Sequence, residues 1–354
     1  MSELRLSASL YQRFIKCPKS AAYSISNETK HLNKPTLGAV LGLVSHSLIE
    51  NSVRISAQSS PEQIVEWFES SWEKYVEEHR TNLEREWSPN KVPKPQSWPR
   101  YFATRASAKT LVLKNFGLLP PRYLVQSALN KKTIPDKFDL PFVEKFLESS
   151  DLRIFGKPDF VFIEDGKVVI YDYKFGRNQE DLEKHKFQML FYQVLVESVL
   201  NLEVGKLVIV TSANHAWEIA TDRQELEDLR RDIPRVLDAI ESNRVAAIPT
   251  LNNCKFCPFK AVCEPFKNAK IDLYPNRPMA ISGEILTIRR IDHDFQEVTI
   301  KAESASEEET IRVFGIPNGY SLRVGESIFL TDNLEFLDEK IIGFSWNSRI
   351  SIQG

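Results

Sequence analysis

Two aspartates and a lysine occupy neighbouring strands of a predicted hairpin. Residues 156–174 read GKPDFVFIEDGKVVIYDYK. The Asp165-Gly166 pair separates two apolar runs and suits a two-residue turn, in which both positions take positive φ. The register that this turn imposes places Asp159 directly opposite Asp172. Lys174 shares their face, because side chains alternate along a strand.

Two opposed carboxylates beside an ammonium group suit metal-assisted hydrolysis. Like charges that face each other need a cation, and Mg²⁺ prefers oxygen ligands while keeping waters and substrate phosphate. Such an ion activates a water and stabilises the charge that builds on a phosphodiester. We therefore predict Asp159, Asp172 and Lys174 as catalytic, with both aspartates holding Mg²⁺ or Mn²⁺. The alternative is a surface hairpin that carries a cluster of charges.

Four cysteines form a second candidate ligand set. Cys254, Cys257 and Cys263 lie within ten residues, Cys17 lies far upstream, and the chain has no other cysteine. Four thiolates suit tetrahedral Zn²⁺ or an iron–sulfur cluster, and spacing alone does not choose between them. Four cysteines are too few for a disulfide scaffold in so long a chain. With no apolar run of 18 residues and no secretory signal, we expect a cytoplasmic protein without a membrane segment.

Charge is distributed unevenly along the 354 residues. The net charge of -2 would argue against a nucleic-acid partner, but it averages over two oppositely charged regions. Residues 271–354 carry 8 basic and 14 acidic side chains, so the rest of the chain is net positive. Residues 88–134 contain no acid and nine cations, interleaved with aromatic residues. Cations and ring faces are what a surface that binds a nucleic-acid strand requires. The predicted DNA contacts in this segment are Lys91, Lys94, Arg100 and Arg105; the alternative is a solvated basic face over core aromatic residues.

The elements that must position these residues alternate between helices and strands. Residues 4–22 read as a short lead-in and then a helix that Ser7 could cap. Helical patterns cover residues 37–52, 61–86, 100–116, 180–200 and 222–243, and strand patterns cover 152–174 and 207–213. Short strands follow from about residue 275. The order predicts an α/β domain in residues 1–270, with a helical, partly basic section at about 51–140. A small all-β domain, barrel-like, is expected in residues 271–354.

The hairpin motif, Pro158-Asp159 followed by Asp172-Tyr-Lys174, resembles the site of the RecB-like branch of the PD-(D/E)XK nuclease superfamily. The resemblance extends over most of residues 1–270. It includes LSAS at residues 6–9 leading to Cys17-Pro18, a Gly-x-x-x-His motif ending at His46, and a Gln-x-x-x-Tyr motif. The last of these is formed by Gln188 and Tyr192.

This resemblance implies a restriction-endonuclease-like core, a mixed sheet flanked by helices. It makes His46 a further metal ligand and places Gln188 and Tyr192 next to the substrate, whereas Glu144 matches an acidic position of some members only loosely. Members with one cysteine before the core and three after it, such as the AddB subunit and CRISPR-associated nucleases, hold a 4Fe-4S cluster. The same role is implied for Cys17, Cys254, Cys257 and Cys263.

The expected activity is hydrolysis of DNA by a metal-dependent nuclease, as an exonuclease on single strands or ends, in repair, recombination or defence. The alternatives are a non-catalytic DNA-binding or assembly subunit and a site-specific restriction-type endonuclease. The chain has no G-x-x-x-x-G-K-[ST] loop, so we expect it to have no helicase motor of its own. A helicase or other protein partner is expected to contact the acidic residues 271–354.

Overall fold

Two compact units make up the chain in the computed structural model. The structure describes residues 3–55, 60–118, 140, 142–174, 182–211, 216–269, 279–302, 309–332, 334–338, 340–346 and 348–353. The first unit comprises Met1–Ile15, Pro35–Glu78 and Pro95–Arg244, and the second comprises Lys16–Lys34, His79–Lys94 and Val245–Gly354. The cysteine-bearing segments thus group with the C-terminal β region. The boundary at residue 270 stays a prediction about where the chain could be divided into domains.

Cys17 separates two short helices where the sequence predicts a single helix that begins after Ser7 and runs to about residue 22. Helix α1 spans Ala8–Lys16, and the Ser7 hydroxyl caps it by accepting a hydrogen bond from the Leu10 N–H at 3.2 Å. Helix α2 spans Pro18–Ile25 with proline in its first turn. A residue that precedes proline is forced out of the helical region, and Cys17 accordingly has φ -157° and ψ 100°. The expectation of one continuous helix was wrong for this reason.

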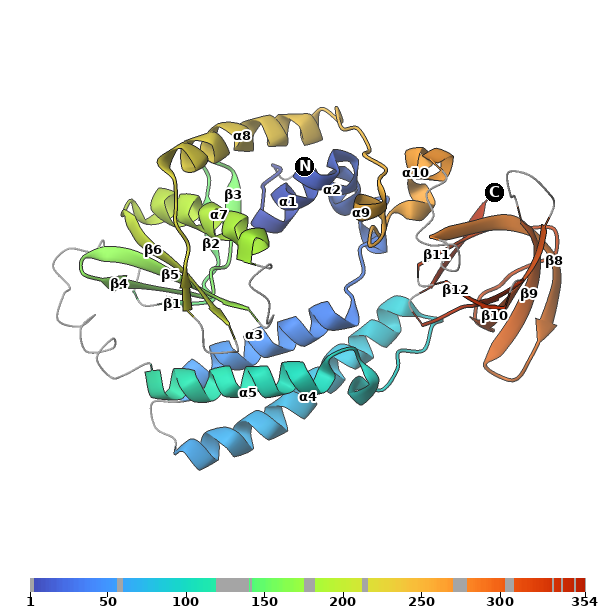
Figure 1. Cartoon of the computed structure of the whole chain (residues 1–354), viewed down its shortest axis with the longest axis horizontal. Helices are drawn as coiled ribbons and strands as arrows, with labels where there is room; N and C mark the ends of the chain where they lie inside the picture. Colours follow the sequence, from blue (N-terminus) through green and yellow to red (C-terminus); the bar gives the residue numbers. More distant parts are fainter. Residues whose placement is uncertain are drawn as a thin grey trace. The chain divides into compact units, whose positions relative to one another are not determined.

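A mixed five-stranded sheet lies in the first unit, as the predicted fold class requires. Its order is β1 (Phe142–Val143), β4 (Phe160–Glu164), β5 (Lys167–Lys174), β6 (Val204–Thr211) and β7 (Ala216–Glu218). Only β5 and β6 pair in parallel, and helix α7 (Leu182–Leu200) connects them. Helix α7 packs on this sheet and on the separate β2–β3 ribbon (Leu147–Ser149 and Ile154–Gly156), with α8 (Arg223–Glu241) beside it (Figure 1).

Three long helices occupy the predicted helical section and its N-terminal flank. They are α3 (Leu37–Ile55), α4 (Pro61–Trp87) and α5 (Tyr101–Leu118), and Figure 1 shows α3 and α5 alongside each other. The short 3-10 helices at Lys30–Leu32 and Pro95–Ser97 lie outside them. Trp72 of α4 is fully buried and donates a hydrogen bond from Nε1 to the Tyr101 hydroxyl at 2.9 Å.

Three aromatic residues in or next to the basic segment are core residues. Trp87, Trp98 and Tyr101 are all buried, at 5% exposed or less. Trp87 packs edge-on against Trp346 within the second unit, at a ring-centroid distance of 5.5 Å. These rings therefore stabilise their own units. The prediction that these three rings stack on bases was wrong, whereas for Phe102, which is 64% exposed, it stays a prediction.

Seven strands form the C-terminal β region of the second unit. Their order is β12 (Glu335–Asp338), β13 (Ile341–Gly343), β10 (Glu309–Pro317), β9 (Phe295–Ala302), β8 (Ala280–Arg290), β11 (Ser327–Thr331) and β14 (Arg349–Gln353). All neighbours pair antiparallel except β10 and β13. Inward-facing aliphatic residues such as Ile285, Ile300 and Val313 form its core, which accords with the predicted all-β class. Helices α9 (Leu251–Cys254) and α10 (Glu264–Ala269) and the 3-10 helix Lys260–Val262 precede it.

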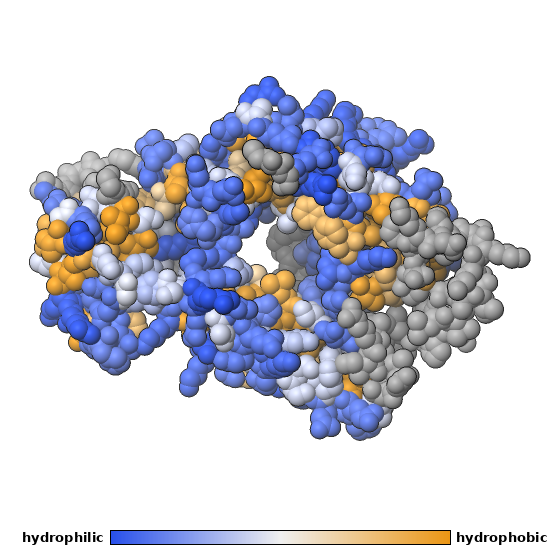
Figure 2. Space-filling model, turned by 180° about the vertical axis from the view of Figure 1, so that it is seen from behind, coloured by the Kyte–Doolittle hydropathy of each residue, from blue (hydrophilic) through white to orange (hydrophobic). Residues whose placement is uncertain are grey.

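Apolar side chains also reach the surface of the β region. Figure 2, in which this region lies at the left, shows orange patches among hydrophilic residues. Exposed members include Val324 and Leu337, at 63% and 64%. Among the residues described, no helix combines the length and apolar character needed to cross a membrane.

The turn of the β4–β5 hairpin generates a test of the fold. Gly166 has φ +78°, a conformation that costs an L-residue roughly 1–2 kcal/mol. Gly166→Ala should therefore lower the free energy of unfolding by about that amount, measured as a lower urea midpoint at unchanged m-value.

The matched control for this substitution is Gly38→Ala. Gly38 lies in α3, and an added Cβ there would meet no atom within 4 Å. Alanine in a helix is favoured over glycine by roughly 0.5–1 kcal/mol, so the control should leave stability unchanged or raise it. Equal midpoints for Gly166→Ala and the wild type would contradict the turn assignment.

Candidate active site and cysteine pocket

The β4–β5 hairpin brings Asp159 and Asp172 together. Phe160 pairs with Tyr171 and Glu164 with Lys167, which confirms the predicted register, and Asp165 and Gly166 both have positive φ. Asp159 directly precedes β4 and Asp172 lies within β5. The Tyr173 N–H donates to Asp159 Oδ2 at 2.6 Å, which holds the first carboxylate against the strand that carries the second.

Both carboxylates are withdrawn from water. Asp159 is 6% exposed and Asp172 is 1% exposed. Burial, and then the negative charge of Asp172, raise the pKa of Asp159 to about 7. Lys174 Nζ lies 2.6 Å from Asp172 Oδ2, and this buried oxygen makes that ion pair but no hydrogen bond. The pair is therefore only partly satisfied by the protein itself.

His46, Glu144 and Asp159 form one group of potential metal ligands. One ligand atom from each lies within 4.8 Å of the others. His46 Nδ1, on α3, is 3.3 Å from Glu144 Oε1 and 3.5 Å from Asp159 Oδ1. Asp172 lies outside this group and is held by Lys174 instead. The predicted ligands His46 and Asp159 are thus neighbours, and Glu144 takes the third position.

Glu144 reaches the group through the short strand β1. Its N–H donates to the Asp159 carbonyl at 2.9 Å, extending the β1–β4 pairing by one residue, and its φ of 48° turns the chain there. Lys157 Nζ lies 2.5 Å from Glu144 Oε2 and 3.5 Å from Glu50 Oε2. A two-residue strand leaves almost no periodic signal, so sequence reasoning gave Glu144 little weight.

Protonation within the ligand group follows from these contacts. Burial alone would lower the pKa of His46, but the charge of Asp159 and the bond to Glu144 raise it overall. Burial would raise the pKa of Glu144, but His46 and Lys157 together lower it. Without a metal, the ligand group therefore retains protons near neutral pH that an ion must displace.

Gln188 and Tyr192, one turn apart on α7, face the hairpin. Gln188 accepts a hydrogen bond from Lys174 Nζ at 3.0 Å and donates to Asp172 at 3.4 Å and to the Tyr192 hydroxyl at 3.0 Å. The Tyr192 hydroxyl in turn donates to the Lys157 carbonyl at 3.3 Å. Gln188, which is itself bonded to Tyr192, thus positions Lys174 of the hairpin.

The predicted DNA contacts of the basic segment are distributed over both units. Lys91 lies in the second unit and pairs with Asp294 at 2.6 Å, and Lys94 also belongs to that unit. Arg100 and Arg105 lie in the first unit, where Glu69 of α4 binds Arg105. Their part in DNA binding stays a prediction. The further cations Arg122, Lys131 and Lys132 lie outside the described residues.

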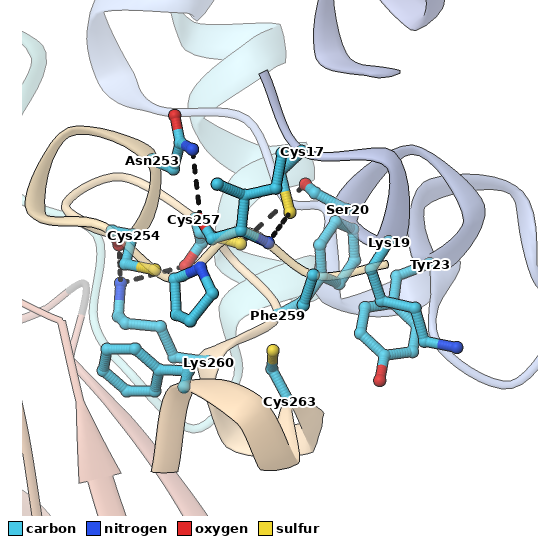
Figure 3. A pocket seen from close by; sticks show the side chains of 14 residues that line it. Cys17, Lys19, Ser20, Tyr23, Asn253, Cys254, Cys257, Phe259, Lys260 and Cys263 are labelled. Carbon is cyan, nitrogen blue, oxygen red and sulfur yellow. Dashed lines mark hydrogen bonds between the residues drawn. The ribbon is translucent and has the colours of Figure 1, made fainter. Parts of the chain in front are cut away.

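The four cysteines line one pocket within the second unit, shown in Figure 3. Cys17 comes from the break between α1 and α2, and the other three come from the segment at residues 254–263. Asn253 Nδ2 ties the two segments by donating to the Lys16 carbonyl at 2.9 Å. The Ile248 N–H donates to Cys17 Sγ at 3.4 Å. Burial, and then Cys257, raise the pKa of Cys254 to about 11.

The donor sets fit two different kinds of metal. Two carboxylates and an imidazole suit a hard divalent ion such as Mn²⁺, with positions left for water and substrate. Four thiols that share one pocket, with apolar walls including Phe259 and Phe266, suit a thiophilic centre. No three of the four sulfur atoms lie within 4.8 Å of one another among the residues described.

Proton displacement at the ligand group should make metal affinity depend on pH. Mn²⁺ must displace the proton of Asp159, whose pKa is about 7, and find His46 neutral. Affinity should therefore rise by at least about tenfold per pH unit from pH 5 to 7 and then level off, as measured by titration calorimetry. Glu203→Gln, at an exposed site, should behave as wild type, whereas affinity that is constant from pH 5 to 8 would contradict the site.

Comparison of the sequence with protein families gives one match. The model of the PD-(D/E)XK nuclease superfamily matches residues 5–264. The crystal structure of SSO0001 is 18% identical, covering 47% of this chain and 79% of that chain with a TM-score of 0.25. A murine DNA binding protein bound to double-stranded DNA is 12% identical, covering 60% and 91%, with a TM-score of 0.18. Both likenesses are too weak to bear on fold or function, and no curated protein matches.

The family match covers the hairpin, the ligand group and all four cysteines. The matched range contains the mixed sheet and its flanking helices, and the catalytic roles of Asp159, Asp172 and Lys174 stay a prediction. The chain belongs to the PD-(D/E)XK nuclease superfamily, a membership that indicates a metal-dependent nuclease.

Proposed function

We propose that the protein is a Mg²⁺- or Mn²⁺-dependent deoxyribonuclease of the RecB-like branch, acting on single strands or DNA ends. The observation that carries this proposal is that His46 of α3 and Glu144, next to β1, meet the β4–β5 hairpin that carries Asp159 and the Asp172–Lys174 pair. A hydrolytic site needs a metal position and a cation that orients the nucleophile, and these five residues supply both.

The chain's own residues divide the work of hydrolysis. His46, Glu144 and Asp159 would hold the ion, and Asp172 offers a buried oxygen without a hydrogen bond beside them. A divalent ion supplies an activated water and stabilises negative charge on the phosphate. Lys174, held between Asp172 and Gln188, would orient the attacking water or steady the phosphate oxygen.

The cysteine pocket supports a 4Fe-4S cluster as the second part of the proposal. The four cysteines line one pocket, and the choice of iron over zinc rests on the resemblance to nucleases with one cysteine before the core and three after it. Lys260, 2% exposed, holds the loop by donating to the carbonyls of Cys254 and Cys257 at 3.2 and 2.9 Å (Figure 3).

Location and partners follow from the same chemistry. All four cysteines are free thiols, as metal ligands in a reducing compartment would be, which supports the cytoplasm. Exposed apolar residues of the β region, such as Val324 and Leu337, support a contact there with a helicase or another protein. Repair, recombination or defence are the settings in which such a nuclease would act.

A cleavage assay on labelled single-stranded DNA with Mg²⁺ or Mn²⁺ tests the catalytic assignment. Lys174→Met should lower kcat by roughly a hundredfold or more, because it removes the cation at the site of charge development. Asp172→Asn should do the same by releasing that cation. Lys167→Met is the matched control, since Lys167 lies at the far end of β5 and pairs with exposed Glu203.

The competing functions give different results in that assay. Wild-type protein that binds DNA and never cleaves it, with either metal, would favour the non-catalytic assembly subunit. Discrete bands from plasmid DNA would favour a restriction-type endonuclease over digestion from ends. Equal cleavage by wild type, Asp172→Asn and Lys174→Met would remove the assigned site.

Metal analysis of protein purified without oxygen tests the cluster. We expect about four iron atoms per chain with matching sulfide and visible absorption. Cys254→Ser should lose the iron and lower Tm by about 5 °C or more, because metal binding contributes to folding. Ser20→Ala is the control: its hydroxyl lies 3.9 Å from Cys257 Sγ but is not a ligand. One zinc per chain and no iron would overturn the cluster.

A further inference from the structure

A cavity of about 360 Å³ adjoins the candidate active site inside the first unit. Its walls come from the start of α1, from the β2–β3 ribbon with its flanking residues, and from α7. Gln188 and Tyr192 form the wall on the α7 side. The same two side chains bond Lys174, Asp172 and the Lys157 carbonyl, so the cavity and the site share a boundary.

An exposed aromatic ring lies at this cavity. Phe146 is 58% exposed although it is large and apolar, and its ring is tilted against Phe155 at a centroid distance of 5.7 Å. Both rings line the cavity. A ring face left open to solvent beside a hydrolytic site is what stacking on a nucleobase requires.

The chain path links this ring to the metal ligands. Phe146 follows Glu144 by two residues, a separation of at most about 7 Å along the backbone. On the same rim, Lys157 is about half exposed and its ammonium lies 2.5 Å from Glu144 Oε2. A group bound against Phe146 is therefore within about one nucleotide of a phosphate at the ligand group.

Polar groups also line the cavity. Ser7, Ser9 and Gln12 line the cavity from α1, and the Ser7 and Ser9 hydroxyls lie 3.0 Å apart. Hydroxyl and amide groups can both donate and accept hydrogen bonds, which suits the mixed edge of any base. The lining thus combines a stacking face with adaptable polar contacts and has no acidic member.

We propose that this cavity receives the base of a nucleotide next to the scissile phosphate, stacked on Phe146. The proposal rests on the proposed nuclease function. It adds a contact with a base, through Phe146, which belongs to none of the motifs named above. Stacking accepts every base because each has a π-face, so the subsite binds a strand with little sequence preference. It requires an unpaired base, which favours single-stranded DNA over a duplex interior.

The test is binding of a fluorescein-labelled oligo-dT to the full chain in Ca²⁺, followed by anisotropy. Phe146→Ala should weaken binding by about tenfold, and Phe146→Trp should restore it. Ile15→Ala is the control, because Ile15 is equally exposed, at 59%, on the α1 helix but does not line the cavity. Since Phe146 is exposed, both alanine variants should melt as the wild type does.

A scan of single abasic positions along the oligonucleotide identifies the contact. One abasic position should weaken binding to wild type by about tenfold and leave binding to Phe146→Ala unchanged, since the variant has already lost that stack. Equal binding by wild type and Phe146→Ala would overturn the subsite, and so would a wild type that does not bind oligo-dT. Wild type that shows the base-dependent binding but never cleaves in Mg²⁺ or Mn²⁺ would defeat the nuclease and leave the subsite intact.

Discussion

Two buried carboxylates that face each other are the constraint on which the site depends. Asp159 and Asp172 are brought together by a two-residue turn and removed from water, where their mutual repulsion is little screened. Neighbouring cationic or ionisable groups offset that repulsion. Lys174 pairs with one aspartate and His46 lies against the other, while Glu144 needs Lys157 as its own partner. A divalent ion would neutralise the negative charge that these groups offset only in part.

The hairpin was predictable because local chemistry determines it. Asp165 and Gly166 take the positive φ that their residue types allow, and alternation along the strands then sets which side chains meet. The fold class was predictable for a similar reason, since helical and strand periods alternate over long segments. Where periodicity was long or turn chemistry strong, sequence and structure agree.

Long-range pairing decided what the sequence did not show. Glu144 joins the ligands through a strand of two residues, which is too short to leave a periodic pattern in the sequence. The basic segment is acid-free in sequence, yet α4 supplies Glu69 to Arg105 and Lys109 from far along the chain. Its aromatic residues look available in sequence, but Trp98 and Tyr101 are buried by helices that the segment itself helps to form. Composition within a window cannot reveal partners outside it.

The interleaving of the two compact units has a consequence for biosynthesis. The second unit takes residues 16–34 and 79–94 and is completed only by residues 245–354, whereas the first unit has all its segments once residue 244 is made. As the chain leaves the ribosome, the first unit can therefore finish folding before Cys254, Cys257 and Cys263 are available to join Cys17. The proposed metal centre on these cysteines would then assemble late in maturation. A nascent chain halted before residue 254 would carry a formed hairpin with an incomplete thiol site.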